Sequence, residues 1–467
     1  MEPITLRELL DAVGGTLTGD FADLDTVITA VDTDSRKMHP GSLFIPLEGE
    51  RFDGHSFIEG AMESGAVGCI FSRNRDSYRP DRFYVKVRST QRALRDLAQW
   101  YKRRFDIPFL AITGSVGKTT TKDMVAAVLG EKYKVLKTDG NFNNNIGLPL
   151  TLLRLEREHE ICVLEMGMNH AGEIEYLSDI VEPDVALITN VGDAHIENLG
   201  SREGIFHAKC EIFSHMKAGG KAILNGDDEW LAKLRCSDIL PCGAVFVGAG
   251  EGLDYTASQL ESDGETNLSC HVTGPNGEFD LCIPALGDHM IYPTLMAAAA
   301  GELFGMTEEE IIRGVQNFLP TKMRMNVLRL PGDVVVLNDA YNANPQSMRA
   351  AAAVLGAAKG RRKVAVVGDM LELGENSDVF HRMVGSSFAE EGVDCLIAAG
   401  PLAKELASGA EESGVKEVYY FAEPVHAIPT VCRELKPGTT ILVKASRAMA
   451  FERFVEALSA QAEQDRN

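Results

Sequence analysis

Short apolar runs alternate with longer amphipathic stretches along most of the chain, and this alternation predicts an α/β protein. The run "FLAIT" predicts a buried strand, and "TKDMVAAVLGEKY" after it predicts a helix whose apolar face holds Met124, Val125, Val128 and Leu129. The runs "ICVLEM" and "VALITNV" are typical of buried parallel strands. Strand, glycine-rich turn, helix and strand in this order indicate a right-handed parallel crossover unit. The stretch "HMIYPTLMAAAAGELFG" predicts a further helix.

Two other segments flank this unit. Before it, the apolar runs "SLFIPL" and "AVGCIFS" are followed by the helical pattern "STQRALRDLAQWYKRRF". After it, "VVVLND", "KVAVVGD", "CLIAAG" and "TILVKAS" alternate with helix-like stretches, which indicates a second open, mostly parallel sheet. We therefore expect three α/β domains, over residues 1–106, 107–319 and 320–467, with a hinge near "NFLPTKM".

Composition is ordinary for a soluble globular protein, with 45% hydrophobic and 24% charged residues, and a length of 467 residues favours about three domains. No run approaches the roughly 20 apolar residues of a membrane span, and the N-terminus carries no signal pattern. We therefore expect a cytoplasmic protein, with a monomer as the default. The net charge of -22 argues against nucleic-acid binding, which needs clustered Lys and Arg, but it is compatible with a local nucleotide pocket.

The nine cysteines are scattered singly, with no C-x-x-C pair. Cys236 and Cys242 are nearest to each other along the chain, and no neighbouring residues complete a zinc site. We interpret the cysteines as reduced, mostly buried thiols.

The stretch "AITGSVGKTTTKDM" carries the first candidate chemistry. A phosphate-binding loop usually reads G-x-x-x-x-G-K-[ST], but Ile112 stands where the first glycine belongs. The shorter loop still offers a backbone nest, a lysine for the outer phosphates and a hydroxyl for magnesium. The alternative is a strand-to-helix turn with a solvent-exposed lysine. The predicted nucleotide-binding residues of the loop are Gly114, Ser115, Val116, Gly117, Lys118, Thr119 and Thr120.

Two polar residues follow the next predicted strands. Glu165 ends "ICVLEM" before a glycine, and His195 lies in "TNVGDAHIENLGS". The carboxyl ends of parallel strands face the crevice where ligands bind, and magnesium needs hard ligands there. Taken alone, Glu165 could cap a turn and His195 could be a loop histidine. Their combination with the loop favours a magnesium–nucleotide site.

Longer motifs resemble one family. The segments "TGSVGKTTTKD", "GNFNNNIGLPLTLL", "EMGMNHAGEIEYL", "NVGDAHIENLGSREGIFHAKCEIF" and "NDAYNANPQSM" are similar to those of the Mur ligases. "DTDSRKMHPGSLFIPLEGERFDGHSFI", "GDMLELGE" and "VKASRAMAFE" extend the resemblance over nearly the whole chain. The shortened loop is this family's own form. "DAYNANP" discriminates best, because sister ligases carry different residues after that aspartate.

The resemblance implies a small domain for the UDP-sugar, a central P-loop ATPase-like domain and a mobile C-terminal Rossmann-like domain. It implies an ATP-dependent ligase that joins D-alanyl-D-alanine to UDP-N-acetylmuramoyl-tripeptide through an acyl phosphate, giving the pentapeptide precursor of peptidoglycan. The expected cofactors are ATP and two Mg²⁺. The third residue of the tripeptide, diaminopimelate or lysine, stays open.

The resemblance also assigns roles to residues. Lys118 and Thr119 handle the phosphates, and Thr119, Glu165 and His195 serve the metal ions. Lys209 matches a position that is carbamylated in relatives and helps to hold a second metal. Without the family, Lys209 is simply a helix lysine.

Further matches lie in the flanking segments. Arg324 suits a phosphate, Asp339 suits ribose hydroxyls, and Asn342 lies near them, although Asn and Asp also favour the turn before Pro345. The remaining matched positions are Ser35 and Arg36 near the uridine diphosphate, Asn143 and Asn144 in a substrate loop, and Ser446 and Arg447 toward the acceptor. An exposed arginine and turn-forming asparagines are the ordinary alternatives.

One place departs from the family. After the histidine of "GDHMIYPTL", relatives carry asparagines, the second of them near the adenine, where this chain has Met290 and Pro293. The adenine contact therefore does not transfer.

Three other functions compete. A kinase or mechanical NTPase would use the same loop without forming an amide. A non-catalytic sugar-nucleotide-binding protein would bind without turnover. A sister ligase that adds a single amino acid, or a folylpolyglutamate synthetase, would share the chemistry, but "DAYNANP" argues against both.

Overall fold

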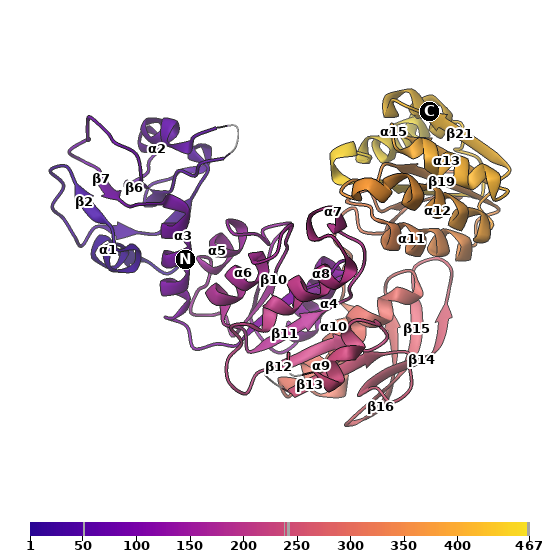
Figure 1. The fold of residues 1–467 in the computed structure, drawn as a ribbon, viewed down its shortest axis with the longest axis horizontal. Helices are drawn as coiled ribbons and strands as arrows, with labels where there is room; N and C mark the ends of the chain where they lie inside the picture. The colour runs from indigo at the N-terminus through magenta and orange to yellow at the C-terminus, as the bar shows by residue number, and fades with distance from the viewer. Residues whose placement is uncertain (50–51, 238, 241–242, 465–467) are drawn as a thin grey trace.

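The chain folds into three α/β domains in sequence order, and Figure 1 shows the N-terminal and C-terminal domains at opposite ends with the central domain between them. The computed structural model describes residues 1–49, 52–237, 239–240 and 243–464. Three mixed sheets, one in each domain, confirm the predicted fold class. The boundaries at residues 106 and 319 stay predictions. Cys242 lies outside the described residues, and none of the described helices is long and apolar enough to cross a membrane.

The N-terminal domain is built on a five-stranded sheet in the order β2-β7-β6-β5-β4. The predicted strands are β5 and β6, and the predicted helix is α3. Tyr101 on α3 donates to the carbonyl of Leu155 at 2.6 Å, which fixes this helix to the central domain. The elements are β1 (Ile4–Thr5), α1 (Leu6–Val13), β2 (Thr16–Thr18), β3 (Val27–Ile28), β4 (Ala30–Asp32), β5 (Ser42–Phe44), α2 (Ile58–Glu63), β6 (Gly68–Phe71), β7 (Phe83–Lys86) and α3 (Thr90–Lys102).

A nine-stranded sheet in the order β16-β15-β14-β13-β12-β11-β8-β10-β9 forms the central domain. The three apolar runs predicted as parallel strands are β8, β10 and β11, and they are adjacent and parallel. The strands are β8 (Phe109–Thr113), β9 (Val135–Lys137), β10 (Ile161–Glu165), β11 (Val185–Ile188), β12 (Lys221–Asn225), β13 (Gly243–Gly248), β14 (Tyr255–Ser262), β15 (Leu268–Gly274) and β16 (Gly277–Ile283). The helices are α4 (Lys118–Leu129), α5 (Gly147–Leu152), α6 (Glu173–Val181), α7 (Ile196–Leu199), α8 (Arg202–Cys210), α9 (Ile291–Leu303) and α10 (Glu308–Gln316).

Alternate residues of β8 face two different helical layers. Leu110 and Ile112 pack in one core with α4, α9 and α10, whereas Phe109 and Ala111 pack in the other with α3, α5 and α6. Burial on both faces explains why β8 is apolar throughout. Met124, Val125, Val128 and Leu129 pack together in the core that α4 shares with α9 and α10, as expected, and Thr121, Lys122 and Asp123 of the same helix are buried as well.

The strands β14, β15 and β16 extend the sheet in a way that the sequence did not predict. The first pairs parallel with β13, and the other two continue antiparallel. Their residues alternate between buried and exposed, as in β16, where Phe279, Leu281 and Ile283 point inward. Such alternation is typical of a sheet with one solvated face, and it lacks the continuous apolar runs of the other strands.

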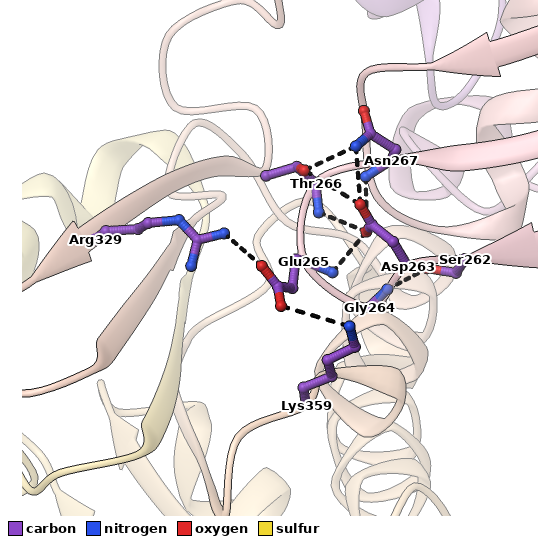
Figure 2. A network of polar contacts seen from close by, with 8 residues as sticks. All are labelled: Ser262, Asp263, Gly264, Glu265, Thr266, Asn267, Arg329 and Lys359. Carbon is purple, nitrogen blue, oxygen red and sulfur yellow. Dashed lines mark hydrogen bonds and ion pairs between the residues drawn. The ribbon is translucent and has the colours of Figure 1, made fainter.

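The turn between β14 and β15 contacts the C-terminal domain (Figure 2). Asp263 accepts hydrogen bonds from the backbone N–H groups of Glu265, Thr266 and Asn267 and so closes the turn. Glu265 then lies between two cations of the next domain, 3.0 Å from Arg329 and 3.4 Å from Lys359. The central sheet therefore reaches past the hinge to touch the C-terminal domain.

The C-terminal domain contains a six-stranded sheet in the order β17-β18-β22-β19-β20-β21. The four predicted strands are β18, β19, β20 and β22, all mutually parallel, while the antiparallel edge strand β17 and the far edge strand β21 were not predicted. The elements are β17 (Asn326–Leu330), β18 (Val334–Asn338), α11 (Pro345–Ala357), β19 (Arg362–Gly368), α12 (Ser377–Glu390), β20 (Cys395–Ala399), α13 (Ala403–Glu412), β21 (Glu417–Phe421), α14 (Ile428–Cys432), β22 (Thr439–Lys444) and α15 (Glu452–Gln464).

Candidate functional site

The predicted phosphate loop connects the end of β8 to the start of α4. Gly114 has φ of 151° and Gly117 has φ of 83°, both values that favour glycine. A Cβ on Gly114 would lie 1.8 Å from the Thr189 hydroxyl oxygen, so only glycine fits there. The segment after β11 holds the loop, because Asn190 accepts from the N–H of Val116 at 2.9 Å and Ser115 accepts from that of Gly192 at 2.9 Å.

Lys118 lies back over this loop. Its ammonium donates to the carbonyl of Gly114 at 2.7 Å and contacts that of Ser115 at 3.4 Å. Burial lowers the pKa of Lys118, and the nearby carboxylate of Glu165 opposes that shift. The lysine is thus held at the N-terminus of α4, where backbone N–H groups favour an anion. Thr119 is buried one residue further along the helix, and the side chain of Thr120 borders the adjoining cavity.

Glu165 ends β10 beside the loop, as predicted. Its side chain is buried; Oε1 accepts from Asn143 at 2.8 Å, and Oε2 has no hydrogen-bond partner among the described residues. A buried carboxylate oxygen without a partner is costly unless a cation occupies the place in front of it. Asn144 serves a local purpose, since it accepts from the N–H groups of Ile146 and Gly147 at the start of α5.

His195 precedes α7 with a left-handed φ of 64°. Its Nδ1 lies 2.8 Å from Oε2 of Glu372 in the C-terminal domain, a contact that lowers the pKa of Glu372. This pair joins two domains across the site. The sequence did not predict it, because nothing near "GDMLELGE" indicates which residue the glutamate faces.

Lys209 is fully buried on α8, outside both of the cavities described below. Burial, together with the charge of Lys118, holds the pKa of Lys209 well below its usual range, while Asp228 opposes the shift. A lysine in that environment carries an uncharged amine more readily than a surface lysine does. This makes the predicted carbamylation chemically reasonable.

Two cavities meet at the phosphate loop. The first, of about 310 Å³, is lined by Val116, Gly117, Thr120, Met290, Tyr292, Pro293, Phe318, Asp339 and Lys444, among others. The second, of about 1060 Å³, is lined by Lys118, Thr119, Asn143, Asn144, Glu165, His195, Tyr341, Asn342 and Arg447, among others. Arg324 lines both cavities, and its guanidinium lies 3.5 Å from the Thr119 hydroxyl.

Asp339 faces the first cavity, but its carboxylate already has two partners. Oδ2 lies 2.5 Å from the ammonium of Lys444, and Oδ1 accepts from the N–H of Met325 at 3.1 Å. Of the turn residues considered for this motif, Asn344 caps α11 and Asn342 accepts from the N–H of Ala343 at 2.9 Å, whereas the carboxylate of Asp339 bonds to the distant Met325 and Lys444. Lys444 is fully buried and was not predicted; it lies 105 residues from its partner along the chain.

Not every predicted residue meets at these cavities. Ser446 is buried, with its hydroxyl accepting from the N–H of Leu371 at 2.9 Å, whereas Arg447 borders the larger cavity. Ser35 and Arg36 lie in the N-terminal domain, away from the lining of either cavity, and the Arg36 side chain is 87% exposed with Asp34 as its partner. The structure therefore places these two residues apart from the phosphate loop.

Met290 and Pro293 both line the smaller cavity, so the departure from the family lies within that cavity. Between them Tyr292 presents an aromatic ring to the same cavity, and its hydroxyl contacts Asp227 at 3.2 Å. Tyr292 was not among the predicted residues. An aromatic residue between the two substituted positions was the signal in the sequence, because aromatic rings can stack on bases.

Models of Mur ligase domains match three parts of the chain. They are the "Mur ligase family, catalytic domain" at residues 27–102, the "Mur ligase middle domain" at 112–301 and the "Mur ligase, glutamate ligase domain" at 323–447.

Curated relatives cover nearly the whole chain. UDP-N-acetylmuramoyl-tripeptide–D-alanyl-D-alanine ligase of Bacillus subtilis is 39% identical over 97% of this chain and 98% of its own, and that of Escherichia coli is 37% identical over 98% and 99%. Among solved structures, MurF from Acinetobacter baumannii superimposes with a TM-score of 0.90 at 34% identity, covering 98% and 99% of the two chains. MurF ligase from Thermotoga maritima in complex with ADP has a TM-score of 0.84 at 30% identity, covering 95% and 100%.

Proposed function

This chain belongs to the Mur ligase family, and we propose that it joins D-alanyl-D-alanine to the terminal carboxylate of UDP-N-acetylmuramoyl-tripeptide while ATP is converted to ADP and phosphate. The observation that carries the proposal is the junction of the two cavities at the phosphate loop. A nucleotide in the smaller cavity would point its γ-phosphate past Lys118 and Thr119 into the larger one. In the larger cavity, the tripeptide carboxylate and the amine of D-alanyl-D-alanine could both reach the γ-phosphate.

ATP is needed because a carboxylate is a poor electrophile at neutral pH. In the first step the tripeptide carboxylate oxygen attacks the γ-phosphorus, ADP leaves, and an acyl phosphate forms. In the second step the amine of D-alanyl-D-alanine attacks the acyl carbon, and the tetrahedral intermediate expels phosphate as the amide forms. Such phosphoryl transfer depends on positioning and charge neutralisation, which Lys118 and Arg324 supply from two sides.

The residues at the junction fit magnesium. Glu165 has a buried oxygen without a hydrogen-bond partner among the described residues, and Thr119 of the loop and His195 line the same cavity. We assign Mg²⁺ to Thr119, Glu165 and His195, with carbamylated Lys209 assisting a second ion. Bound there, the metal would neutralise charge on the phosphates. Asn143 holds the Glu165 side chain in its orientation.

Substrate contacts complete the proposal. We assign Asp339 and Asn342 to the nucleotide, Arg447 and Ser446 to the acceptor side, and Ser35 and Arg36 to the uridine diphosphate. Asn143 and Asn144 would shape the substrate loop. The reaction would take place in the cytoplasm and supply the pentapeptide precursor of peptidoglycan.

Phosphate release tests the proposal. ATP and Mg²⁺ are supplied with UDP-muramoyl tripeptide and D-alanyl-D-alanine, first singly and then together. Release that needs both, with the pentapeptide mass appearing, supports the ligase, and Lys118→Ala should abolish it. Release with ATP alone would instead indicate an NTPase. A product that gains only one amino acid would indicate a sister ligase, and binding without turnover would indicate a non-catalytic protein.

A further inference from the structure

Arg324 is held at the junction of the two cavities without an acidic partner. Its guanidinium lies 3.5 Å from the Thr119 hydroxyl, and among the described residues no carboxylate lies within salt-bridge distance of it. Its Nε is buried and has no hydrogen-bond partner among those residues. The guanidinium carbon lies over the ring of Tyr341, 4.1 Å from the ring centroid.

The backbone around Arg324 is strained. Met323 and Met325 on either side have φ of 63° and 51°, a conformation that is uncommon for residues other than glycine. Such strain persists only where the surroundings enforce it. Here the β18–α11 loop of the C-terminal domain does so: Asp339 accepts from the N–H of Met325 at 3.1 Å, and the N–H of Tyr341 donates to the carbonyl of Met323 at 3.2 Å.

The kind of partner matters for a phosphate-binding arginine. A carboxylate would fix the guanidinium but would also offset its charge and occupy its N–H donors. An aromatic face holds the guanidinium by a cation–π contact and leaves the donors at its edge free. The ring of Tyr341 therefore positions the cation while its charge stays available to a phosphate.

We propose that Tyr341 is the positioning residue of Arg324: its ring holds the guanidinium at the phosphate loop, ready for the γ-phosphate. Because Tyr341 belongs to the C-terminal domain and Thr119 to the central domain, the stack completes the phosphate site only when the two domains lie in this orientation. The inference rests on the proposed function, since it assumes that Arg324 acts on ATP.

Four variants test the stack: Tyr341→Phe, Tyr341→Leu, Arg324→Lys and the double variant Arg324→Lys/Tyr341→Leu. Tyr341→Phe keeps the ring and should stay within about twofold of the parent kcat. Tyr341→Leu removes the ring but keeps a shorter apolar side chain, and it should lower kcat roughly 3- to 30-fold, the range expected from a cation–π contact. Since Arg324→Lys already loses the planar stack, Tyr341→Leu should add no more than about a twofold loss in that background.

Two outcomes would overturn the proposal: the same fold loss from Tyr341→Leu in both backgrounds, or Tyr341→Phe as damaging as Tyr341→Leu. Nucleotide affinity provides a readout that needs no acceptor. Calorimetry with Mg²⁺ should show Tyr341→Leu weakening a non-hydrolysable ATP analogue more than ADP, while equal weakening would mean a general structural defect. A parent enzyme that binds nucleotide but forms no amide would refute the proposed function, and the affinity comparison would still decide the role of Tyr341.

Discussion

Replacing Gly114 with alanine is the sharpest test of the phosphate loop. The new Cβ would lie 1.8 Å from Oγ1 and 3.0 Å from Cβ of Thr189. Thr189 is not free to move aside, because it is buried, its hydroxyl donates to the carbonyl of Val116 at 2.6 Å, and its N–H donates to that of Thr113 at 3.0 Å. Either the hydrogen bond from the Thr189 hydroxyl breaks or the loop shifts.

The magnitude follows from these contacts. Overpacking a rigid site costs about 1–3 kcal/mol, and losing the hydroxyl hydrogen bond costs about 1 kcal/mol. We therefore expect these two effects to lower the free energy of unfolding of the central domain by about 2–4 kcal/mol, beyond the cost of placing alanine at a positive φ, which Gly117→Ala shares. A loop shift on the order of 1 Å should lower turnover about 100-fold. Gly117→Ala is the matched control for stability, since φ is 83° there but nothing lies within 4 Å of the added Cβ, and it should cost only about 1–2 kcal/mol.

The assay combines phosphate release in the presence of both acceptor substrates with denaturant unfolding of the free protein. Thr189→Ala removes the closest contact, so the double variant Gly114→Ala/Thr189→Ala should recover part of the stability that Gly114→Ala loses. Turnover within twofold of the parent in Gly114→Ala, or a loss of stability no larger than that of Gly117→Ala, would refute the steric reasoning. Strict additivity in the double variant would show that Thr189 is not the obstacle.

Three further predictions concern charged side chains. Lys118→Ala should abolish turnover while unfolding stays cooperative, and turnover like that of the parent would remove Lys118 from the phosphate site. Lys209→Ala should be inactive but partly rescued by added short carboxylates, which replace the carbamate; normal activity without them would exclude the carbamate. Glu265→Gln removes exposed ion pairs and should cost less than about 1 kcal/mol of stability, yet broaden the distances between spin labels on the central and C-terminal domains. Glu261→Gln, which alters an exposed glutamate on β14 just before the turn that holds Glu265, should leave those distances unchanged.

The strands around the site could be predicted from the sequence because burial on both faces leaves continuous apolar runs. β8, β10 and β11 were found in this way, and so was Glu165 at the carboxyl end of β10. The phosphate loop could be predicted equally well, because its geometry is set within one short segment by two glycines and the start of the following helix. What local patterns could not indicate were strands with alternating or mixed burial, such as β16 and β17.

The sequence by itself determined the family, the parallel core of each larger domain and the predicted phosphate loop, because each depends on patterns within short segments of the chain. Only the tertiary structure decided which distant residues complete the site. Lys444 meets Asp339, Glu372 meets His195, and Tyr341 meets the strained hinge around Arg324. Such pairs join loops from different strands or domains, and no periodicity along the chain predicts them. Their geometry is fixed only when sheets and hinge have packed together, which is why the partners of the predicted residues emerged from the fold.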